Sequence, residues 1–195
     1  MELRLPSEDD LVELARLAED GIHPPEQMPF YVPWTDRIGE PGFVDDFVAF
    51  HLRQRREWTA ERWQLLLGTW ADGHLAGVQG LDAQEFASRR TAETGSWLGR
   101  WFQGHGYGTE MRAAALGLLF DGLGGEVATS GSLEGNIASA RVSEKLGYVH
   151  DGEAVASPRG EPVRERRFTL EHSRWRPPFP IGIVGLGPCL PLFGL

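Results

Sequence analysis

Apolar positions along the chain follow two periods, and each period predicts one kind of element. After Ser7, which is typical of a helix start, Leu11, Leu14 and Ala18 recur at helical spacing. Similar patterns predict helices over residues 43–58, 107–121 and 137–146, and strands over residues 2–5, 63–71, 75–82, 91–98, 126–133, 148–154 and 162–172. A run of antiparallel strands followed by strand–helix–strand units indicates an α+β fold with a mixed sheet.

The helix predicted over residues 107–121 has an apolar stripe, and two strands before it are joined by a short turn. The stripe consists of Met111, Ala114, Ala115, Leu118 and Leu119. Asp72-Gly73 is a turn sequence typical of a two-residue hairpin between residues 63–71 and 75–82. These local signals place most of the chain in regular elements.

Two segments fall outside this periodicity. Residues 22–42 are rich in proline and aromatic side chains, and a connection of that length inside a domain is typically functional. The last 15 residues are almost wholly apolar, are too short to span a bilayer, and contain glycines and prolines that should prevent a helix (Gly185, Gly187, Pro188, Pro191). We therefore expect one domain over residues 1–174, with a tail over residues 175–195 that packs either on that domain or on a partner in a homodimer.

Composition excludes several classes of protein. The chain has 195 residues and a net charge of −9, which argues against nucleic acid as a partner because no broad basic face can form. The single cysteine, Cys189, excludes an internal disulfide and a cysteine-based zinc site, and the six histidines form no H-x-x-x-H pair. No metal and no membrane segment are expected, and the sequence predicts a cytoplasmic protein.

The segment Gln103-Gly-His-Gly-Tyr-Gly-Thr109 has the strongest chemical signal. It lies between a predicted strand and a predicted helix, where glycines let a ligand approach the backbone and the helix N-terminus favours an anion such as phosphate. It lacks the third glycine of the dinucleotide fingerprint and the Gly-Lys-Ser/Thr of a Walker loop. Alone, the segment indicates an anion site or only a tight turn.

Two motifs in order resemble those of the GNAT N-acetyltransferases. Gln103, Gly106 and Gly108 occupy the fixed positions of the family's Q/R-x-x-G-x-G/A signature, and the segment from Asn136 to Tyr148 is similar to its N-x-x-S…EKLGF/Y motif. The residues of these two motifs most resemble those of the RimJ/RimL-like branch of the family, which includes ribosomal-protein N-terminal acetyltransferases. The resemblance implies a twisted mixed sheet whose two central parallel strands splay apart, flanked by helices.

The same resemblance implies where acetyl-CoA, the co-substrate, would bind. The pantetheine arm would pair with the backbone of Ser96, Trp97 and Leu98, and the pyrophosphate would lie on the loop residues (Gln103, Gly104, His105, Gly106, Tyr107, Gly108, Thr109). Asn136 and Ser139 lie where the family contacts the pantetheine and its thiol end. Asn136 is equally well explained as the N-cap of the following helix.

In this family the amine attacks the thioester directly, within a ternary complex, so the reaction needs a neutral amine. An α-amine with a pKa of about 7.8 is partly neutral at pH 7.5, whereas neutralising a lysine amine costs about 4 kcal/mol. Glu93, ten residues before the loop, is the candidate base, and burial would have to raise its pKa. A glutamate that only supports the strand is the alternative.

The proton for the leaving thiolate has no obvious source. Many relatives carry a tyrosine five residues before the closing aromatic residue, but this chain has Ser143 there. Ser139 and Ser143 are the remaining catalytic candidates, although a serine hydroxyl is a weak acid. The missing tyrosine also leaves open a non-catalytic acyl-CoA-binding module as the alternative function.

The aromatic loop is the expected wall of the acceptor site. Phe30, Tyr31 and Trp34 would form its apolar floor, and Asp36 or Glu40 would attract a cation. The sequence therefore predicts an N-acetyltransferase that moves an acetyl group from acetyl-CoA to a primary amine, either a protein N-terminus or a small molecule.

Overall fold

The computed structural model describes residues 1–195 and contains one seven-stranded sheet with the strand order β1-β2-β3-β4-β5-β7-β6. The strands are β1 (Glu2–Arg4), β2 (Arg62–Ala71), β3 (His74–Gln84), β4 (Thr91–Leu98), β5 (Val127–Leu133), β6 (Val149–Ala156) and β7 (Val163–Glu171). The helices are α1 (Glu8–Glu19), α2 (Phe43–Arg56), α3 (Phe86–Arg89), α4 (Tyr107–Gly117) and α5 (Ile137–Lys145). Only β4 and β5 pair in parallel, which confirms the predicted mixed sheet.

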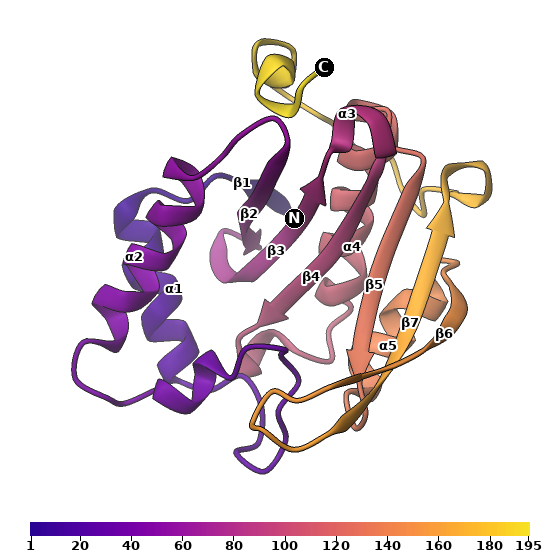
Figure 1. Cartoon of the computed structure of the whole chain (residues 1–195). Coiled ribbons are helices and arrows are strands. Elements are labelled where there is room, and N and C mark those ends of the chain that lie inside the picture. Colours follow the sequence, from indigo (N-terminus) through magenta and orange to yellow (C-terminus); the bar gives the residue numbers. More distant parts are fainter.

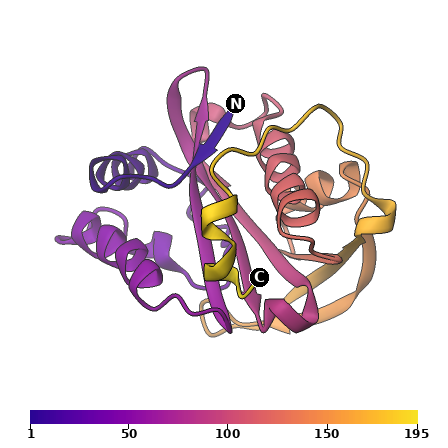
Figure 2. The same ribbon diagram turned by 90° about the horizontal axis from the view of Figure 1, so that it is seen from above.

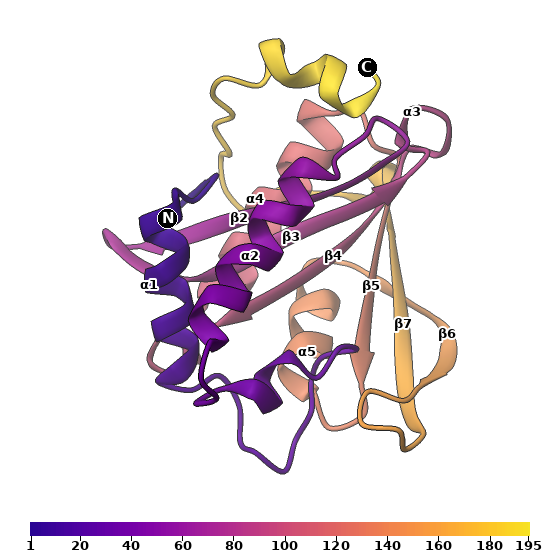
Figure 3. The same ribbon diagram turned by 60° about the vertical axis from the view of Figure 1, so that its left-hand side comes forward.

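Helices cover the sheet on both faces. Helices α1 and α2 lie on one face, here called the outer face, and α4 and α5 lie on the other, here called the helix face (Figures 1 and 2). The helices α1 and α2 contact β2 and β3, whereas α4 and α5 contact β3, β4 and β5. Figure 3 shows β4 and β5 spreading apart from the end of the sheet near α3.

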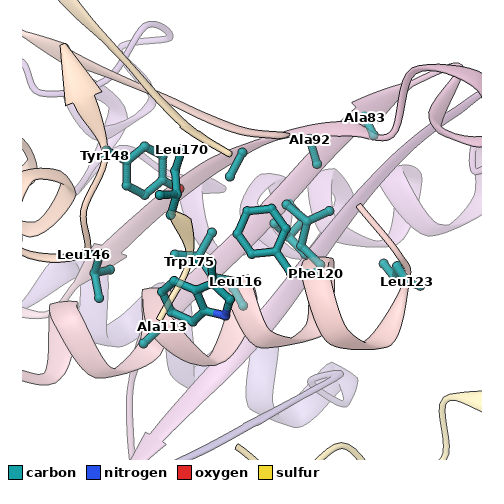
Figure 4. Packing of buried hydrophobic residues seen from close by; sticks show 14 of the residues in the cluster. Ala83, Ala92, Ala113, Leu116, Phe120, Leu123, Leu146, Tyr148, Leu170 and Trp175 are labelled. Atoms are coloured by element: carbon teal, nitrogen blue, oxygen red, sulfur yellow. The ribbon is translucent and has the colours of Figure 1, made fainter. Parts of the chain in front are cut away.

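Each face of the sheet has its own apolar core. The larger cluster joins the sheet to α4, and Figure 4 shows Trp175 beside Leu116 and Phe120 in it. The smaller cluster joins α1 and α2 to the outer face through Leu11, Leu14 and other buried residues. Two cores on a central sheet are typical of a three-layer domain.

Local signals fixed several element boundaries. Ser7 is the N-cap of α1, and its hydroxyl accepts from the Asp10 amide while the Asp10 carboxylate accepts from the Ser7 amide. Asp72 and Gly73 both have positive φ in the β2–β3 hairpin, as the turn sequence predicted. Helix α3 was not predicted, because four residues are too few for a periodic signal.

The predicted stripe of the third helix was partly wrong. Ala114 and Leu118 are only half-buried, while Ala113 and Leu116 are fully buried, and the α-helix ends at Gly117 in a π turn. The reason is that α4 is covered on more than one side, since the C-terminal tail packs against it as well as the sheet. A helix buried on several sides has no single apolar stripe.

The tail folds back over its own chain. Gly117 leaves room for Ile181, because a Cβ at that glycine would lie 2.7 Å from the isoleucine side chain. Phe193 belongs to the larger core, and the Trp58 indole donates to the Leu192 carbonyl oxygen at 2.7 Å. The expectation that the tail contains no helix was wrong. A 3-10 helix runs from Gly187 to Phe193, and its first proline lies in the first turn, where no amide proton is needed.

None of the helices combines the length and the apolar character that crossing a bilayer requires.

Candidate active site

The glycine loop before α4 presents unpaired backbone amides to open space. Gly104 and Gly106 have φ values of 79° and 90°, and a Cβ at either position would meet no atom within 4 Å. The amides of residues 104–108 donate to no acceptor in the protein. Five such amides at a helix start, with the positive end of the helix dipole, form an anion site.

Side chains around this loop hold it in place. The side-chain amide of Gln103 donates from its Nε2 to the carbonyl oxygens of Leu98, at 2.8 Å, and Ile22, at 2.7 Å. The Tyr107 hydroxyl donates to the Asp72 carboxylate at 2.7 Å, which ties the helix start to the β2–β3 hairpin. Gln103, predicted to bind the cofactor, therefore uses its amide nitrogen to join β4 to the loop that follows α1.

Two further loop residues, His105 and Thr109, were also predicted to contact the cofactor. The ring of His105 is exposed and stacks on Tyr107 at a centroid distance of 6.0 Å. Thr109 is half-buried in the first turn of α4, and Gly108 packs near Leu98, where a Cβ would make an ordinary contact at 3.8 Å. The loop thus exposes backbone and one imidazole to the space in front of the helix.

Strands β4 and β5 separate before β4 reaches this loop. They pair over only three residues each and end their pairing at Glu93 and Thr129. Beyond that point the β5-facing edge of Ser96, Trp97 and Leu98 has no strand partner. An unpaired strand edge inside a sheet can pair with an extended ligand, which is the role that the family resemblance implies for these residues.

Hollows lie on both sides of this separation. One, of about 200 Å³, is lined by the β5–α5 connection, including Ser132 and Asn136. The other, of about 500 Å³, lies between the end of α1, the 22–42 loop and Arg100.

The two polar residues predicted at the start of α5 are engaged within the helix. The Asn136 side chain accepts from the Ser139 amide at 3.2 Å, so Asn136 is the N-cap of α5. The Ser139 carbonyl oxygen accepts from the Ser143 hydroxyl at 3.2 Å. Ser143 is fully buried and also accepts a bond of 2.8 Å from Arg112.

Acidic side chains gather around Glu93 on the outer face. Glu93 and Asp82 are directly opposite each other in the β3–β4 register, and Glu165 lies on β7. The Glu93 side chain is open to solvent, yet the protein around it raises its pKa, chiefly by desolvation and then by repulsion from Asp82 and Glu165. Arg167 opposes this rise. A carboxylate with a raised pKa is a stronger base near neutral pH.

The predicted acceptor loop contributes a tyrosine to this cluster. Tyr31 donates to the Glu165 carboxylate at 2.8 Å, and its hydroxyl occupies the space that a side chain at Gly131 would need. Burial and the Glu165 carboxylate raise the Tyr31 pKa, so its hydroxyl stays protonated. Tyr31 thus closes the outer face over β5.

The other two predicted loop aromatics cover the core. Phe30 and Trp34 pack against each other with their rings tilted by 42°, and Trp34 packs against Trp97 at a centroid distance of 5.8 Å. The expectation that Asp36 or Glu40 attracts a cation was wrong, because each already pairs with an arginine of the protein, Arg159 and Arg37 respectively. On the sheet, Asp82 and Glu93 form no ion pair, whereas Glu165 pairs with Arg167 at 3.2 Å.

Sequence reasoning missed Arg112, Asp82 and Glu165. The two acids come together only through strand register, which no local motif encodes. Arg112 had a readable signal, because it is the only charged residue between Met111 and Phe120. No group of three or more His, Cys, Asp or Glu side chains in the structure could hold a metal ion.

Comparison with known families decides the identity of the fold. The sequence profile described as "Acetyltransferase (GNAT) domain" matches residues 1–149. The chain belongs to the GNAT acetyltransferase family. This confirms the resemblance drawn from the glycine loop and the Asn136 motif, and it makes the protein an acetyltransferase.

Solved GNAT structures share this fold over most of their length. RimJ from Mycobacterium smegmatis, in complex with CoA-disulfide, has 18% identity and a TM-score of 0.70, with 87% of this chain and 80% of that chain covered. An N-acetyltransferase from Staphylococcus aureus has 15% identity and a TM-score of 0.67, with 88% and 98% covered. A chimera of the spermidine N-acetyltransferase SpeG from Vibrio cholerae and hSSAT has 17% identity and a TM-score of 0.68, with 89% and 97% covered. At such identities the likeness establishes the fold and not the acceptor.

Proposed function

We propose that this GNAT protein transfers the acetyl group of acetyl-CoA to a primary amine, with direct attack of the amine in a ternary complex. The observation that carries the proposal is the position of Glu93. It marks the point where β4 and β5 separate, with the free amides of the glycine loop beyond the strand end and an acidic outer face around it. The glycine loop suits a phosphate-bearing acyl donor, and the acidic outer face suits a cationic acceptor.

The loop residues fit a CoA-type donor. The backbone amides of residues 104–108 would hold the pyrophosphate, and the open positions at Gly104 and Gly106 leave room for it. The unpaired edge of residues 96–98 would pair with the amide groups of the pantetheine arm. When bound, acetyl-CoA supplies an acetyl group activated as a thioester.

The acidic cluster would select and deprotonate the acceptor. Asp82 and Glu93, which form no ion pair, attract a protonated amine, whereas Glu165 is already paired with Arg167, the cation that opposes the rise in the Glu93 pKa. Glu93 then takes a proton from the amine as the base, directly or through water. An α-amine needs less help than a lysine amine, so either a protein N-terminus or a small amine satisfies this chemistry.

The experiment that tests the donor is thermal unfolding with and without acetyl-CoA. A ligand at 100 times its dissociation constant stabilises the folded state by about 2.7 kcal/mol, which is several degrees for a chain of this size. No rise in Tm would contradict the proposal. A rise without thiol release against any amine would leave only the acyl-CoA-binding function.

Gly106→Val tests the loop. A side chain there obstructs ligand approach, so affinity for acetyl-CoA should fall by at least about tenfold. The open space around the position avoids a clash, and thermal unfolding of the variant measures the cost of placing valine at a φ of 90°. Gly160→Val is the matched control, since Gly160 has a similar φ of 86° and open surroundings far along the chain in the β6–β7 turn. Isothermal titration compares the two variants, and equal affinities would show that the loop does not bind the donor.

Glu93→Gln tests the base. We expect turnover to fall by about 100-fold or more with unchanged affinity for acetyl-CoA, because the amide cannot take a proton. Glu126→Gln, an exposed glutamate just before β5, is the control and should keep full turnover. If both variants turn over normally, Glu93 only supports the strand.

A further inference from the structure

Arg112 is a cation buried inside the molecule without an anionic partner. Only 3% of the residue is exposed, and no carboxylate forms an ion pair with it. Its contacts are three hydroxyls: Ser143 at 2.8 Å, and Ser130 and Ser96 at 3.4 Å each. The Nε proton has no partner at all.

This arrangement is unfavourable unless something completes it. A guanidinium cannot lose its charge in a protein, and burial without an opposite charge costs free energy that hydroxyl dipoles only partly recover. Burial accordingly lowers the Arg112 pKa, which means that the surroundings disfavour the cation. A buried charge with an unused donor therefore points to an anion that arrives from outside the protein.

The position of the guanidinium indicates where that anion arises. Arg112 extends from α4, and its partners Ser96 and Ser130 lie on β4 and β5 just beyond the last paired residues, Glu93 and Thr129. The guanidinium thus lies on the helix face of the separation, and Glu93 lies on the outer face. It is also one turn along the helix whose first amides form the anion site.

We propose that Arg112 stabilises the thiolate released from acetyl-CoA, an inference that rests on the proposed function. In the transfer, the amine nitrogen forms a bond to the acetyl carbon, the carbon–sulfur bond breaks, and its electron pair goes to sulfur. The attacking amine is neutral, its ammonium proton having gone to water, and the proton that its nitrogen loses as the amide forms goes to Glu93. The guanidinium keeps all its protons, so the thiolate leaves as an ion-paired anion and needs no acid at the serine that replaces the family's tyrosine.

Ser143 is a positioning residue in this scheme. Its hydroxyl proton is used in the bond to the Ser139 carbonyl oxygen, and its lone pair accepts from Arg112, so it holds the guanidinium in place. A hydroxyl that is committed in both directions has no proton to give to sulfur. The cation thus takes over the electrostatic work that an acid would do.

The test is an ultraviolet titration of the thiol of CoA bound to the whole protein, with desulfo-CoA as the reference. We expect the pKa of the bound thiol to fall at least one unit below its free value of about 8.5, which is a tenfold shift toward thiolate. Arg112→Met should abolish this shift, Arg112→Lys should keep part of it, and Ser143→Ala should reduce it. Arg141→Met, an exposed arginine on α5, is the control and should keep the full shift.

The outcomes separate the two proposals. If CoA does not raise the Tm of the protein, the proposed function fails and the role of Arg112 fails with it. If CoA binds but its thiol keeps the free pKa in the wild-type protein, only the role of Arg112 is refuted. The wild-type titration decides this even if Arg112→Met does not fold, and Ser143→Ala gives a second variant that leaves the charge in place.

Discussion

Replacing Phe193 with alanine tests whether the C-terminal tail stabilises its own domain. The ring is 4% exposed and lies edge-on to Trp58 and Trp63, at centroid distances of 5.2 and 5.0 Å. Truncating a buried phenylalanine costs about 3–5 kcal/mol, a figure that includes such edge-to-face contacts. Its neighbours Leu192 and Gly194 are exposed and can relax into the vacated space, so we expect the lower end, about 3 kcal/mol.

The assay is thermal unfolding of the full chain at a low and a high protein concentration. For a protein of this length, about 3 kcal/mol lowers the Tm by roughly 6–12 °C. Leu192→Ala is the matched control, because Leu192 is 57% exposed and its carbonyl, which accepts from Trp58, remains in the variant. This control should change the Tm by less than about 3 °C.

Two results would refute the reasoning. If Phe193→Ala and Leu192→Ala have the same Tm, the tail does not pack as the structure has it. If the Tm of the unmodified protein rises clearly with protein concentration and that dependence disappears in Phe193→Ala, the tail packs on a partner subunit instead.

Two pH-dependent predictions follow, one from the charges on the outer face and one from His51, a buried residue of α2. Asp82→Asn should move the acidic limb of the kcat/KM profile to lower pH, because losing a negative neighbour eases ionisation of Glu93, whereas Arg167→Gln should move it to higher pH. Shifts in the same direction would contradict the assignment of Glu93 as the base. His51 is buried and its pKa is lowered to about 4, so its contribution is present above the unfolded value of about 6.5 and is lost as the pH falls toward 4. Urea unfolding should show about 2 kcal/mol lost from this group between pH 7.5 and 5, and His51→Leu should lose correspondingly less.

The sequence was informative wherever a structural signal is local. Strand β4 was predicted at its observed bounds, and the Ser7 cap, the hairpin turn and the glycine loop all have short-range causes. Helix α4 was harder, because its environment depends on a tail that lies far along the chain. The stripe at Ala114 and Leu118 was wrong for that reason.

The site was predictable on one side of the sheet only. The backbone amides that favour an anion follow from glycine spacing, whereas the acids opposite them meet through strand register. Asp82 and Glu93 come from paired strands of a meander, and Glu165 arrives from β7, more than 70 residues after Glu93 in the chain. A reader of the sequence could pair the first two from the hairpin but had no basis for adding the third.

The charges on the two faces of the sheet act in the same direction on the proposed reaction. In the proposed reaction, a proton is removed from the amine on the outer face, where Glu93 has carboxylate neighbours. Negative charge develops on the sulfur on the helix face, where Arg112 has no carboxylate partner. Fixed charges arranged before the reaction stabilise charge as it develops, without reorganisation of solvent. The separation of β4 and β5 lets the two groups act on one bond from opposite sides. In this scheme a serine at position 143 is compatible with catalysis. A tyrosine there would occupy the space, and remove the hydrogen bond, that now hold the guanidinium of Arg112 in place.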